Sequence, residues 1–486
     1  MRIGIVGAGF SGLCAAILLR KAGFEDVTLY ERAADLGGTW RDNTYPGCAC
    51  DIPSNLYSFS FEPNPEWTRM YPQQAEIRAY LERVALKHRL RDRMRFGKAL
   101  SEAVYDAAEC AWRLRFADGS SAVVEVLIGA IGPLSRPRLP EVAGLEGFGG
   151  AAFHSSQWRH DIDLSGKRVA VIGTGASAIQ FLPRIAQQAA RVHVYQRTPP
   201  WVLPLRDRPF APWERRLFRA LPFAQRLLRW WIYLRQELLV RAFLGGAAMQ
   251  RQFRAVGMHF LHRQVADSAL REALTPDYAP GCKRLLISND WYPALQRPNV
   301  ELLAEGVAKI QGNRVVGASG SEREVDAVIF ATGFITTEFV SPMKISGRGG
   351  ADLAAAWKGG AATHLGISVA EFPNFFLMAG PNTALGHNSL VFMIEAQANY
   401  IVGALRHLRD AGLRSLEVRA EVQAHSYAEV QQRMKGTVWA SGCRSWYLSA
   451  DGRNDTLWPG STLDYWRRTL RFDAGNYSAT GAAGVP

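Results

Sequence analysis

Cysteine is scarce in this chain, with six residues among 486. They are Cys14, Cys48, Cys50, Cys110, Cys282 and Cys443. None of them forms the C-x-x-C pairs of a zinc site, so we expect no metal centre, and so few cysteines exclude a disulfide-rich secreted scaffold. Cys48-x-Cys50 could be a redox pair, although two unpaired thiols in a loop are the more ordinary interpretation. The pattern predicts a reduced, cytoplasmic protein.

Long uncharged apolar runs are also lacking, and no stretch approaches the roughly 20 residues that a membrane-spanning helix needs. The apolar run 13–19 follows the glycine-rich GAGFSG, which favours the first helix of a nucleotide-binding fold over a signal peptide. The net charge of +13 is spread along the chain without a long run of basic residues. This distribution indicates a solvated surface, so we expect no nucleic-acid partner.

A first dinucleotide-binding pattern opens the chain. The strand-like run 2–6 leads into the GAGFSG turn at 7–12 and a helical run, and a second strand at 27–30 ends in an acid. Glycines at this spacing permit a tight turn and a close approach of the backbone to a pyrophosphate, and the acid would accept hydrogen bonds from ribose hydroxyls. This pattern alone does not separate FAD from NAD. The expected contacts are Gly7, Gly9, Ser11, Gly12 and Glu31.

A second dinucleotide-binding pattern follows a strand expected at 167–172. A glycine turn opens a helix there, and the next strand, at 192–195, leads into Arg197 and Thr198 rather than into an acid. A cation with a hydroxyl neighbour suits a ribose 2′-phosphate, so this site predicts NADPH over NADH. The turn contributes the expected contacts Gly173, Thr174, Gly175, Ala176, Ser177 and Ala178.

The stretch FGGAAFHSSQW lies between the two patterns and reads F-x-G-x-x-x-H-x-x-x-W. Its defining residues are Phe148, Gly150, His154 and Trp158. Taken alone it is a loop whose histidine is most simply structural. The spacing closely resembles the fingerprint of Baeyer–Villiger monooxygenases, a family that uses FAD and NADPH to insert an oxygen atom beside a ketone carbonyl. Related N- and S-oxygenases usually carry Tyr or Phe where Trp158 stands, and Arg159 departs from the Pro or Asp common in the family.

A second family pattern covers GGTWRDNTYPGCACD at 37–51. The resemblance implies an FAD site with this loop beside the flavin ring, where Trp40 packs on the cofactor and Asp51 points a carboxylate inward. Without the resemblance, a turn or cap role would be the simpler interpretation of Asp51. The same resemblance implies further FAD contacts at Thr39, Tyr57 and Val104.

The region 206–280 interrupts the nucleotide-binding pattern with long, basic, helical sequence that carries many aromatic residues. It could be an amphipathic helix at a membrane interface, or an inserted lobe that covers the active site. The family carries a helical insertion here, so we favour the lobe, and membrane contact is possible but not favoured.

Two later segments also match the family. The resemblance implies that Lys283 contacts the 2′-phosphate and that Arg284, paired with Asp51, reaches the flavin, although a bare Lys-Arg pair is usually surface. The run CRSWYL at 443–448 resembles a mobile loop whose Trp446 folds over the nicotinamide cofactor. The resemblance therefore assigns catalysis to Arg284 and Asp51, since a fixed cation stabilises an oxyanion.

The fold expected is α/β, with two Rossmann-like dinucleotide-binding domains for FAD and NADPH and an inserted helical lobe, in keeping with a chain too long for one core. The FAD-binding domain would take residues 1–140 and 326–486, and the NADPH-binding domain 141–325 with the insertion at about 206–280. We expect the strand within 324–334 to return the chain to the first domain, and His154 and Trp158 to couple the two.

The resemblance implies a monooxygenase that acts through a flavin C4a-peroxide and turns a ketone into an ester or lactone with O2. It implies thioether oxidation as well. An N- or S-oxygenase, a flavin disulfide reductase and a nucleotide-sensing module without activity are the alternatives. Trp158 and the Lys283-Arg284 pair argue against the first, and the second would need a redox thiol pair.

Overall fold

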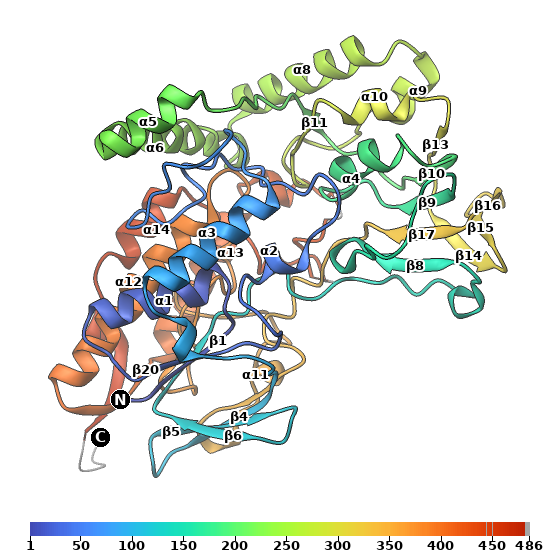
Figure 1. Ribbon diagram of the computed structural model, residues 1–486. Helices are drawn as coiled ribbons and strands as arrows, with labels where there is room; N and C mark the ends of the chain where they lie inside the picture. The colour runs from blue at the N-terminus through green and yellow to red at the C-terminus, as the bar shows by residue number, and fades with distance from the viewer. Residues whose placement is uncertain (444, 450, 482–486) are drawn as a thin grey trace.

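The computed structural model describes residues 1–443, 445–449 and 451–481, and two five-stranded parallel sheets organise it (Figure 1). The first sheet has the order β19-β7-β1-β2-β3. Its strands are β1 (Ile3–Val6), β2 (Val27–Tyr30), β3 (Met94–Arg95), β7 (Val126–Gly129) and β19 (Phe375–Leu377). Strands β1 and β7 are buried along their whole length, as expected of a parallel sheet covered on both faces.

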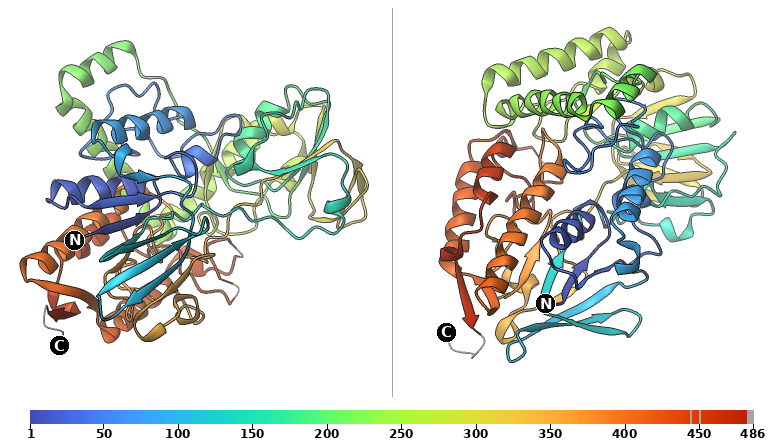
Figure 2. Two further views of the ribbon diagram at one scale, coloured as in Figure 1. Left: turned by 60° about the horizontal axis from the view of Figure 1, so that its bottom comes forward. Right: turned by 60° about the vertical axis from the view of Figure 1, so that its left-hand side comes forward.

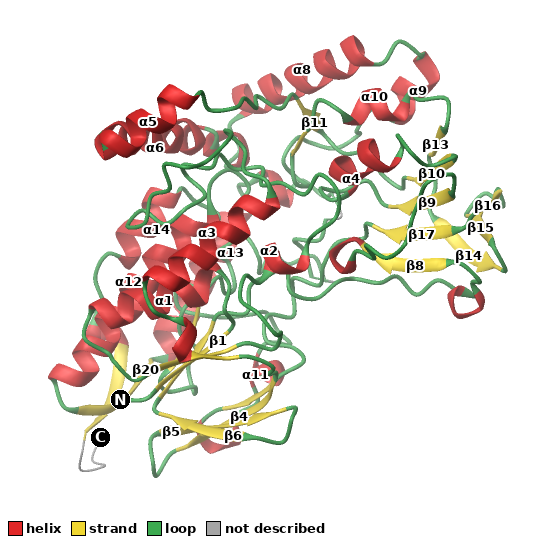
Figure 3. Ribbon diagram, viewed as in Figure 1, coloured by secondary structure: helices red, strands yellow, loops and turns green. Residues whose placement is uncertain are grey.

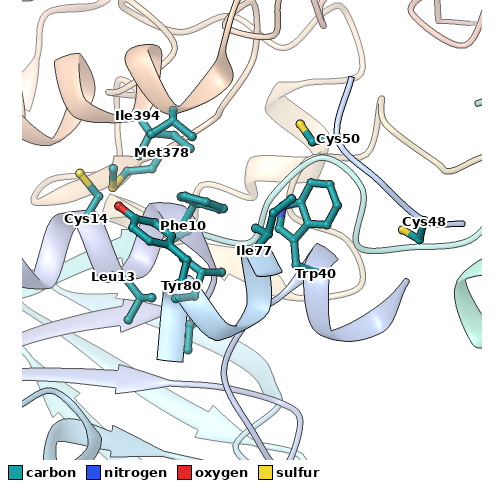
Figure 4. Packing of buried hydrophobic residues seen from close by; sticks show 14 of the residues in the cluster. Phe10, Leu13, Cys14, Trp40, Cys48, Cys50, Ile77, Tyr80, Met378 and Ile394 are labelled. Carbon is teal, nitrogen blue, oxygen red and sulfur yellow. The ribbon is translucent and has the colours of Figure 1, made fainter. Parts of the chain in front are cut away.

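Helices from both ends of the chain cover the first sheet. Helix α1 (Phe10–Lys21) lies against α12 (Leu390–Asp410), and α3 (Gln74–Lys87) adds Tyr80 to the same core. Figure 4 shows Phe10, Tyr80 and Ile394 in this packing. The C-terminal helices α13 (Ala420–Met434) and α14 (Thr462–Thr469), coloured orange to red, complete this side of the molecule (Figure 2). The first unit is therefore built from the beginning and the end of the sequence.

The second sheet has the order β13-β10-β9-β17-β8 and lies to the right in Figure 1. Its strands are β8 (Ala151–His154), β9 (Arg168–Ile172), β10 (Arg191–Tyr195), β13 (Val300–Leu303) and β17 (Ala327–Phe330). The expectation that the strand within 324–334 returns the chain to the first domain is wrong, because β17 pairs with β8 and β9. Its buried apolar run fits either parallel sheet equally well, so the sequence could not choose between them.

Smaller sheets and short helices extend both units. A four-stranded sheet contains β18 (Lys344–Ser346), β4 (Leu100–Asp106), β5 (Ala111–Phe116) and β6 (Ser121–Val124). Other short elements are α2 (Thr39–Asp42), α4 (Ala178–Ile185), α10 (Trp291–Leu295), α11 (Leu353–Ala356), β14 (Val307–Gln311), β15 (Arg314–Gly317), β16 (Glu322–Glu324), β20 (Leu413–Val418) and β21 (Tyr477–Gly481). The sequence suggests one strand over 104–116, but a turn in which Cys110 has φ 49° divides it into β4 and β5.

The helical insertion forms a layer along the top of Figure 3. It contains α5 (Pro212–Ala220), α6 (Pro222–Leu238), α7 (Val240–Phe243), α8 (Ala247–Gln264) and α9 (Ser268–Ala273). The short parallel strands β11 (Val202–Leu203) and β12 (Leu286–Ile287) pair at its base, so the chain leaves and re-enters the second unit at one point. Because β12 begins two residues after Arg284, this pairing also sets where the Lys283-Arg284 segment lies.

Candidate active site

A cavity of about 300 Å³ lies along the first glycine turn. Strand β1 ends at Val6 and α1 begins at Phe10, so the turn between them borders the cavity. Gly7 has φ +110°, and a Cβ there would lie 2.5 Å from the carbonyl oxygen of Ala130, so only glycine fits. A Cβ at Gly12 would collide with the carbonyl oxygen of Gly7. The expected FAD contacts that line the cavity are Gly7, Gly9, Ser11, Glu31, Thr39, Trp40 and Tyr57. Gly12 does not line it but packs against the carbonyl oxygen of Gly7.

Glu31 lies at the end of β2 and is almost fully buried. Its carboxylate accepts hydrogen bonds from the backbone N–H groups of Ala8, at 2.9 Å, and Ala33, at 3.0 Å. It also forms an ion pair of 3.0 Å with Arg41, a residue that no sequence pattern singles out. These contacts fix an acceptor at the edge of the cavity, where a ribose would meet it.

The end of the cavity where the flavin ring is expected is lined by α2 and Tyr57. The indole N–H of Trp40 donates to the Tyr57 hydroxyl at 3.1 Å, and the two rings meet edge to face at 5.6 Å. Burial raises the pKa of Tyr57, so its hydroxyl keeps its proton. Val104 does not line the cavity: it lies within β4, opposite Arg113, and the cavity wall on that side is formed by Ala99 and Leu100.

The second glycine turn repeats the first on the second sheet. Gly173 has φ +102°, and a Cβ there would lie 2.6 Å from the carbonyl oxygen of Ala331. The residues from Thr174 to Ser177 complete the turn, and Ala178 begins α4. No side chain caps α4, and the N–H groups of Ile179 and Gln180 donate to the carbonyl oxygens of Gly175, at 3.2 Å, and Ser177, at 3.1 Å. A phosphate would therefore be bound by the N–H groups of the turn that precedes them.

The structure brings two cations together beside this turn. Arg197 and Thr198 follow β10, and the charge of Arg197 and burial both act on Lys283, with burial the larger cause of its lowered pKa. The Lys283 ammonium lies 4.7 Å from the ring centre of Tyr278. Among the described residues neither Arg197 nor Lys283 forms an ion pair, so this cluster suits an added anion such as a 2′-phosphate.

Arg284 and Asp51 form the ion pair that the resemblance implies. The Asp51 carboxylate accepts from the Arg284 guanidinium at 2.9 and 2.5 Å. The charge of Asp51 is the main cause that raises the pKa of Arg284, and it outweighs the opposite effect of burial. Asp51 ends the 37–51 stretch, whose first residues, 37–42, line the first cavity, and Arg284 follows Lys283 of the cation cluster. The pair therefore lies where the two nucleotide-binding units meet.

A disulfide joins Cys282, next to Lys283, to Cys443 at the start of the expected mobile loop. The expectation of a fully reduced chain is wrong at this pair, which 161 positions separate in the sequence, so spacing gave no sign of it. Cys48 and Cys50 are free, buried and set apart in Figure 4, and burial raises the pKa of Cys48 to about 12. The interpretation of these two as unpaired thiols is confirmed.

Trp446 lies three residues after the disulfide, on a loop in which Arg444 is outside the described residues. Its ring lies 4.3 Å from that of Tyr447, and its carbonyl oxygen accepts from the Thr336 hydroxyl at 2.8 Å. The Tyr447 hydroxyl is buried beside Arg284, and burial raises its pKa. Tyr447 was not expected at the site. It follows Trp446 directly in the sequence. Only the structure reveals it, because the signal is a buried hydroxyl near the Arg284 guanidinium.

The fingerprint stretch connects the two units through aromatic contacts. Trp158 packs on Phe181 of α4 with ring centres 5.2 Å apart. Phe181 lies 6.0 Å from Tyr45 in the flavin loop, as we call residues 37–51, where the resemblance implies contact with the flavin. The Tyr45 hydroxyl donates to the Gln180 side chain at 3.0 Å. His154 is buried at the end of β8, and burial lowers its pKa to about 4, so it is neutral. This geometry is compatible with a role in domain coupling and gives His154 no part as a proton shuttle at neutral pH.

Comparison with known proteins decides the family. Residues 5–73 match an NAD(P)-binding Rossmann-like domain, and residues 54–235 match the L-lysine 6-monooxygenase/L-ornithine 5-monooxygenase family. A Baeyer–Villiger monooxygenase of Pseudomonas aeruginosa is 45% identical over 481 residues, which cover 99% of this chain and 91% of that protein. The chain belongs to the Baeyer–Villiger monooxygenases.

Solved structures agree with this family and with the expected α/β fold. An oxidised steroid monooxygenase bound to NADP superposes with a TM-score of 0.87 at 30% identity, covering 98% of this chain and 99% of that one. A complex of OTEMO with FAD and NADP gives 0.89 at 26% identity, covering 99% of both chains. The chain is thus an NADPH-dependent flavoprotein monooxygenase, which confirms the predicted enzyme class and removes the disulfide reductase and the inactive sensor.

Proposed function

We propose that this Baeyer–Villiger monooxygenase oxidises an apolar ketone beside Arg284, at the junction of the two dinucleotide-binding units. The observation that carries the proposal is the Arg284–Asp51 pair, because it sets a permanent cation between the flavin loop and the cation cluster of the second turn. An apolar cluster that includes Phe243, Trp439 and Tyr447 borders this position and would receive the hydrocarbon part of the ketone.

The residues of both turns fit the expected cofactors. FAD would lie along the cavity, with its pyrophosphate at the Gly7 turn, its ribose at Glu31 and its ring near Trp40. NADPH would lie on the 173–178 turn, with its 2′-phosphate at Arg197, Thr198 and Lys283. When bound, the cofactors supply hydride and the activation of O2. The chain contributes binding, orientation and charge.

Arg284 has the properties that ketone oxidation demands of the protein. A guanidinium stays protonated at any working pH, and Asp51 raises its pKa further. A fixed cation favours the anionic form of an oxygen nucleophile beside it and stabilises the oxyanion that develops on an attacked carbonyl. Asp51 holds the guanidinium in one orientation. The segment formed by the half-buried Trp446 and the buried Tyr447 would cover the site and exclude water.

We also propose that thioethers are oxidised, with a different dependence on Arg284. Sulfur is attacked by an electrophilic oxygen, which needs no anionic nucleophile, so the guanidinium should matter much less than it does for ketones. Ester formation and sulfoxide formation by the same variant therefore separate the effect on the nucleophile from a general loss of the site.

The test is Arg284→Ala, assayed with NADPH, air and a mixed panel of ketones and thioethers. We expect NADPH still to reduce the flavin while ester formation falls by about 10²–10³, the usual effect of removing one oxyanion-stabilising donor. Arg113→Ala is the matched control, since Arg113 forms a 2.7 Å pair with Asp106 on the surface of β5. Esters formed by Arg284→Ala at the wild-type rate would remove Arg284 from the reaction.

A further inference from the structure

Helices α5 and α6 expose an unusual number of large apolar side chains on one side of the lobe. Each is between 53% and 67% exposed. The outer face, as we call this surface, consists of Trp213, Leu221, Phe223, Leu227, Trp230, Trp231, Leu234 and Leu238. On α6 the members recur at helical spacing, so they form one continuous stripe. Soluble monomers rarely expose a contiguous apolar patch of more than a few hundred Å², and larger patches usually mark a binding surface.

The covered face of α6 combines the buried apolar side chains of Ile232 and Tyr233 with polar side chains that are held by hydrogen bonds. Gln225 is buried and donates to the Asn55 side chain and the Asn64 carbonyl, both at 2.7 Å. Arg229 donates to the carbonyl oxygens of Asn55, at 2.8 Å, and Ser58, at 2.9 Å. An ordinary surface helix keeps its large apolar side chains inward, whereas α6 carries them on both faces. Because these hydrogen bonds fix the rotation of α6, the outward direction of its tryptophans is specified by the fold.

The charges that accompany the outer face have one sign. Arg226 and Arg235 are exposed on the same side of α6, and the Arg235 guanidinium lies 4.9 Å from the ring centre of Trp231. Both acids of α5 and α6 are turned inward. Glu214 pairs with Arg208 at 2.7 Å, and Glu237 accepts from Asn388 at 2.8 Å. The outer face therefore presents aromatic and aliphatic side chains among arginines, without a competing carboxylate of its own helices.

This chemistry fits the surface of a membrane that contains anionic lipid. Tryptophan, leucine and arginine on one face are typical of helices that lie in the plane of the lipid headgroups. A second copy of the chain is disfavoured, because a symmetric contact would place the same arginines against each other. Across the residues that the structure describes, no helix has the length and apolar character to cross a bilayer.

We propose that the outer face of α5 and α6 docks the enzyme on an anionic lipid surface. Figures 1 and 2 place both helices at the edge of the molecule, where a planar surface could reach them. The lobe continues into α7, whose Phe243 packs in the apolar cluster with Cys282 and Tyr447. An apolar ketone dissolved in the lipid would thus be concentrated on the outer side of the lobe, and Arg284 lies on its inner side.

The experiment is co-sedimentation of the FAD-loaded enzyme with sucrose-loaded vesicles of phosphatidylcholine, with and without phosphatidylglycerol. We expect binding to the phosphatidylglycerol vesicles that weakens as NaCl is raised from about 0.05 to about 0.5 M. The variant W230Q/W231Q/L234Q should lower the partition coefficient at least about tenfold, since it removes three apolar side chains that would be buried in the lipid. R226Q/R235Q should reduce the preference for phosphatidylglycerol.

A matched control removes exposed apolar side chains elsewhere. Leu86, Leu139 and Leu470 are 71%, 53% and 52% exposed and lie outside the lobe, so L86Q/L139Q/L470Q should bind vesicles as the wild type does. Flavin content and ester formation from a water-soluble ketone report that each variant is folded. Wild-type enzyme that ignores both vesicle types would overturn the proposal. So would a wild-type dimer that W230Q/W231Q/L234Q converts to a monomer without any vesicle binding, because the outer face would then join two copies.

Discussion

The two glycine turns of this molecule share a backbone plan and differ at the end of the next strand. Each turn places a glycine with positive φ against a carbonyl oxygen of a neighbouring strand end, Ala130 in one and Ala331 in the other. The first unit then presents the buried carboxylate of Glu31, and the second presents the exposed Arg197. We therefore expect one frame to serve two cofactors, because the residues that follow the strand, Glu31 after β2 and Gln196-Arg197 after β10, reverse the local charge.

The turns also differ in how much of the chain surrounds them. A Cβ at Gly9 would meet the backbone of Gly38 at 3.7 Å, whereas at Gly175 the nearest atom recorded is a carbonyl oxygen 4.0 Å away. Gly38, from the 37–51 stretch, thus packs directly on the first turn, and within the described part of the chain no such stretch lies against Gly175.

The largest effect should come from filling the first turn. Gly12→Val would drive a side chain into the carbonyl oxygen of Gly7, so we expect protein without bound flavin. Flavin absorbance per protein after purification measures this. Gly359→Ala is the control, because its Cβ would meet nothing within 4 Å. Full flavin content in Gly12→Val would show that the turn does not hold FAD.

Reversing the charge of the second unit should change the nucleotide and leave the flavin in place. For Arg197→Glu we expect KM for NADPH to rise about 100-fold, since a charged hydrogen bond contributes roughly 1.5–3 kcal/mol, with little change for NADH. Steady-state kinetics with both nucleotides measure the ratio. Arg191→Glu, at an exposed position at the opposite end of β10, should behave as the wild type. An unchanged ratio in Arg197→Glu would place the 2′-phosphate elsewhere.

A smaller effect is expected at Lys283, which supports Arg197. Burial and the charge of Arg197 lower its pKa, so raising the pH should deprotonate it earlier than an ordinary lysine and raise KM for NADPH. Lys283→Met should raise that KM about tenfold at neutral pH and flatten its alkaline rise. KM for NADH across the same pH range is the control. An identical alkaline rise in the variant would exclude Lys283 as the titrating group.

The smallest effect at neutral pH concerns His154, which lies on the strand that begins the second unit. Its pKa is about 4 when folded against 6.5 normally, so the unfolded chain takes up the proton first as the pH falls. Stability should be lost from pH 6.5 down to 4, by about 3 kcal/mol in total. His154→Gln should flatten this part of the urea-unfolding profile and change little at neutral pH. Equal acid slopes in both proteins would contradict the assignment.

The sequence predicted what local geometry dictates. The spacing of Gly7, Gly9 and Gly12 reports a turn that other residues cannot adopt, and the charge of Glu31 or Arg197 follows from one position at a strand end. Features that depend on residues far apart in the sequence could not be predicted. Neither the sheet of β17 nor the Cys282–Cys443 pair leaves a periodic signal, and Val104, transferred from the family, lies on a strand that reaches the cavity at Leu100 rather than at Val104. The stripe on α6 was visible, but not that it faces outward.

The bond between Cys282 and Cys443 limits how far the neighbouring loop can move. Their Cα atoms lie 6.3 Å apart, and three residues of extended chain reach about 10 Å further, so Trp446 stays within roughly 17 Å of Cys282 in any conformation. While the disulfide is intact, Trp446 can change its orientation over Arg284 but cannot move far from it. Reduction of the disulfide would leave every contact of the closed state available, but the loop would sample more conformations before those contacts form.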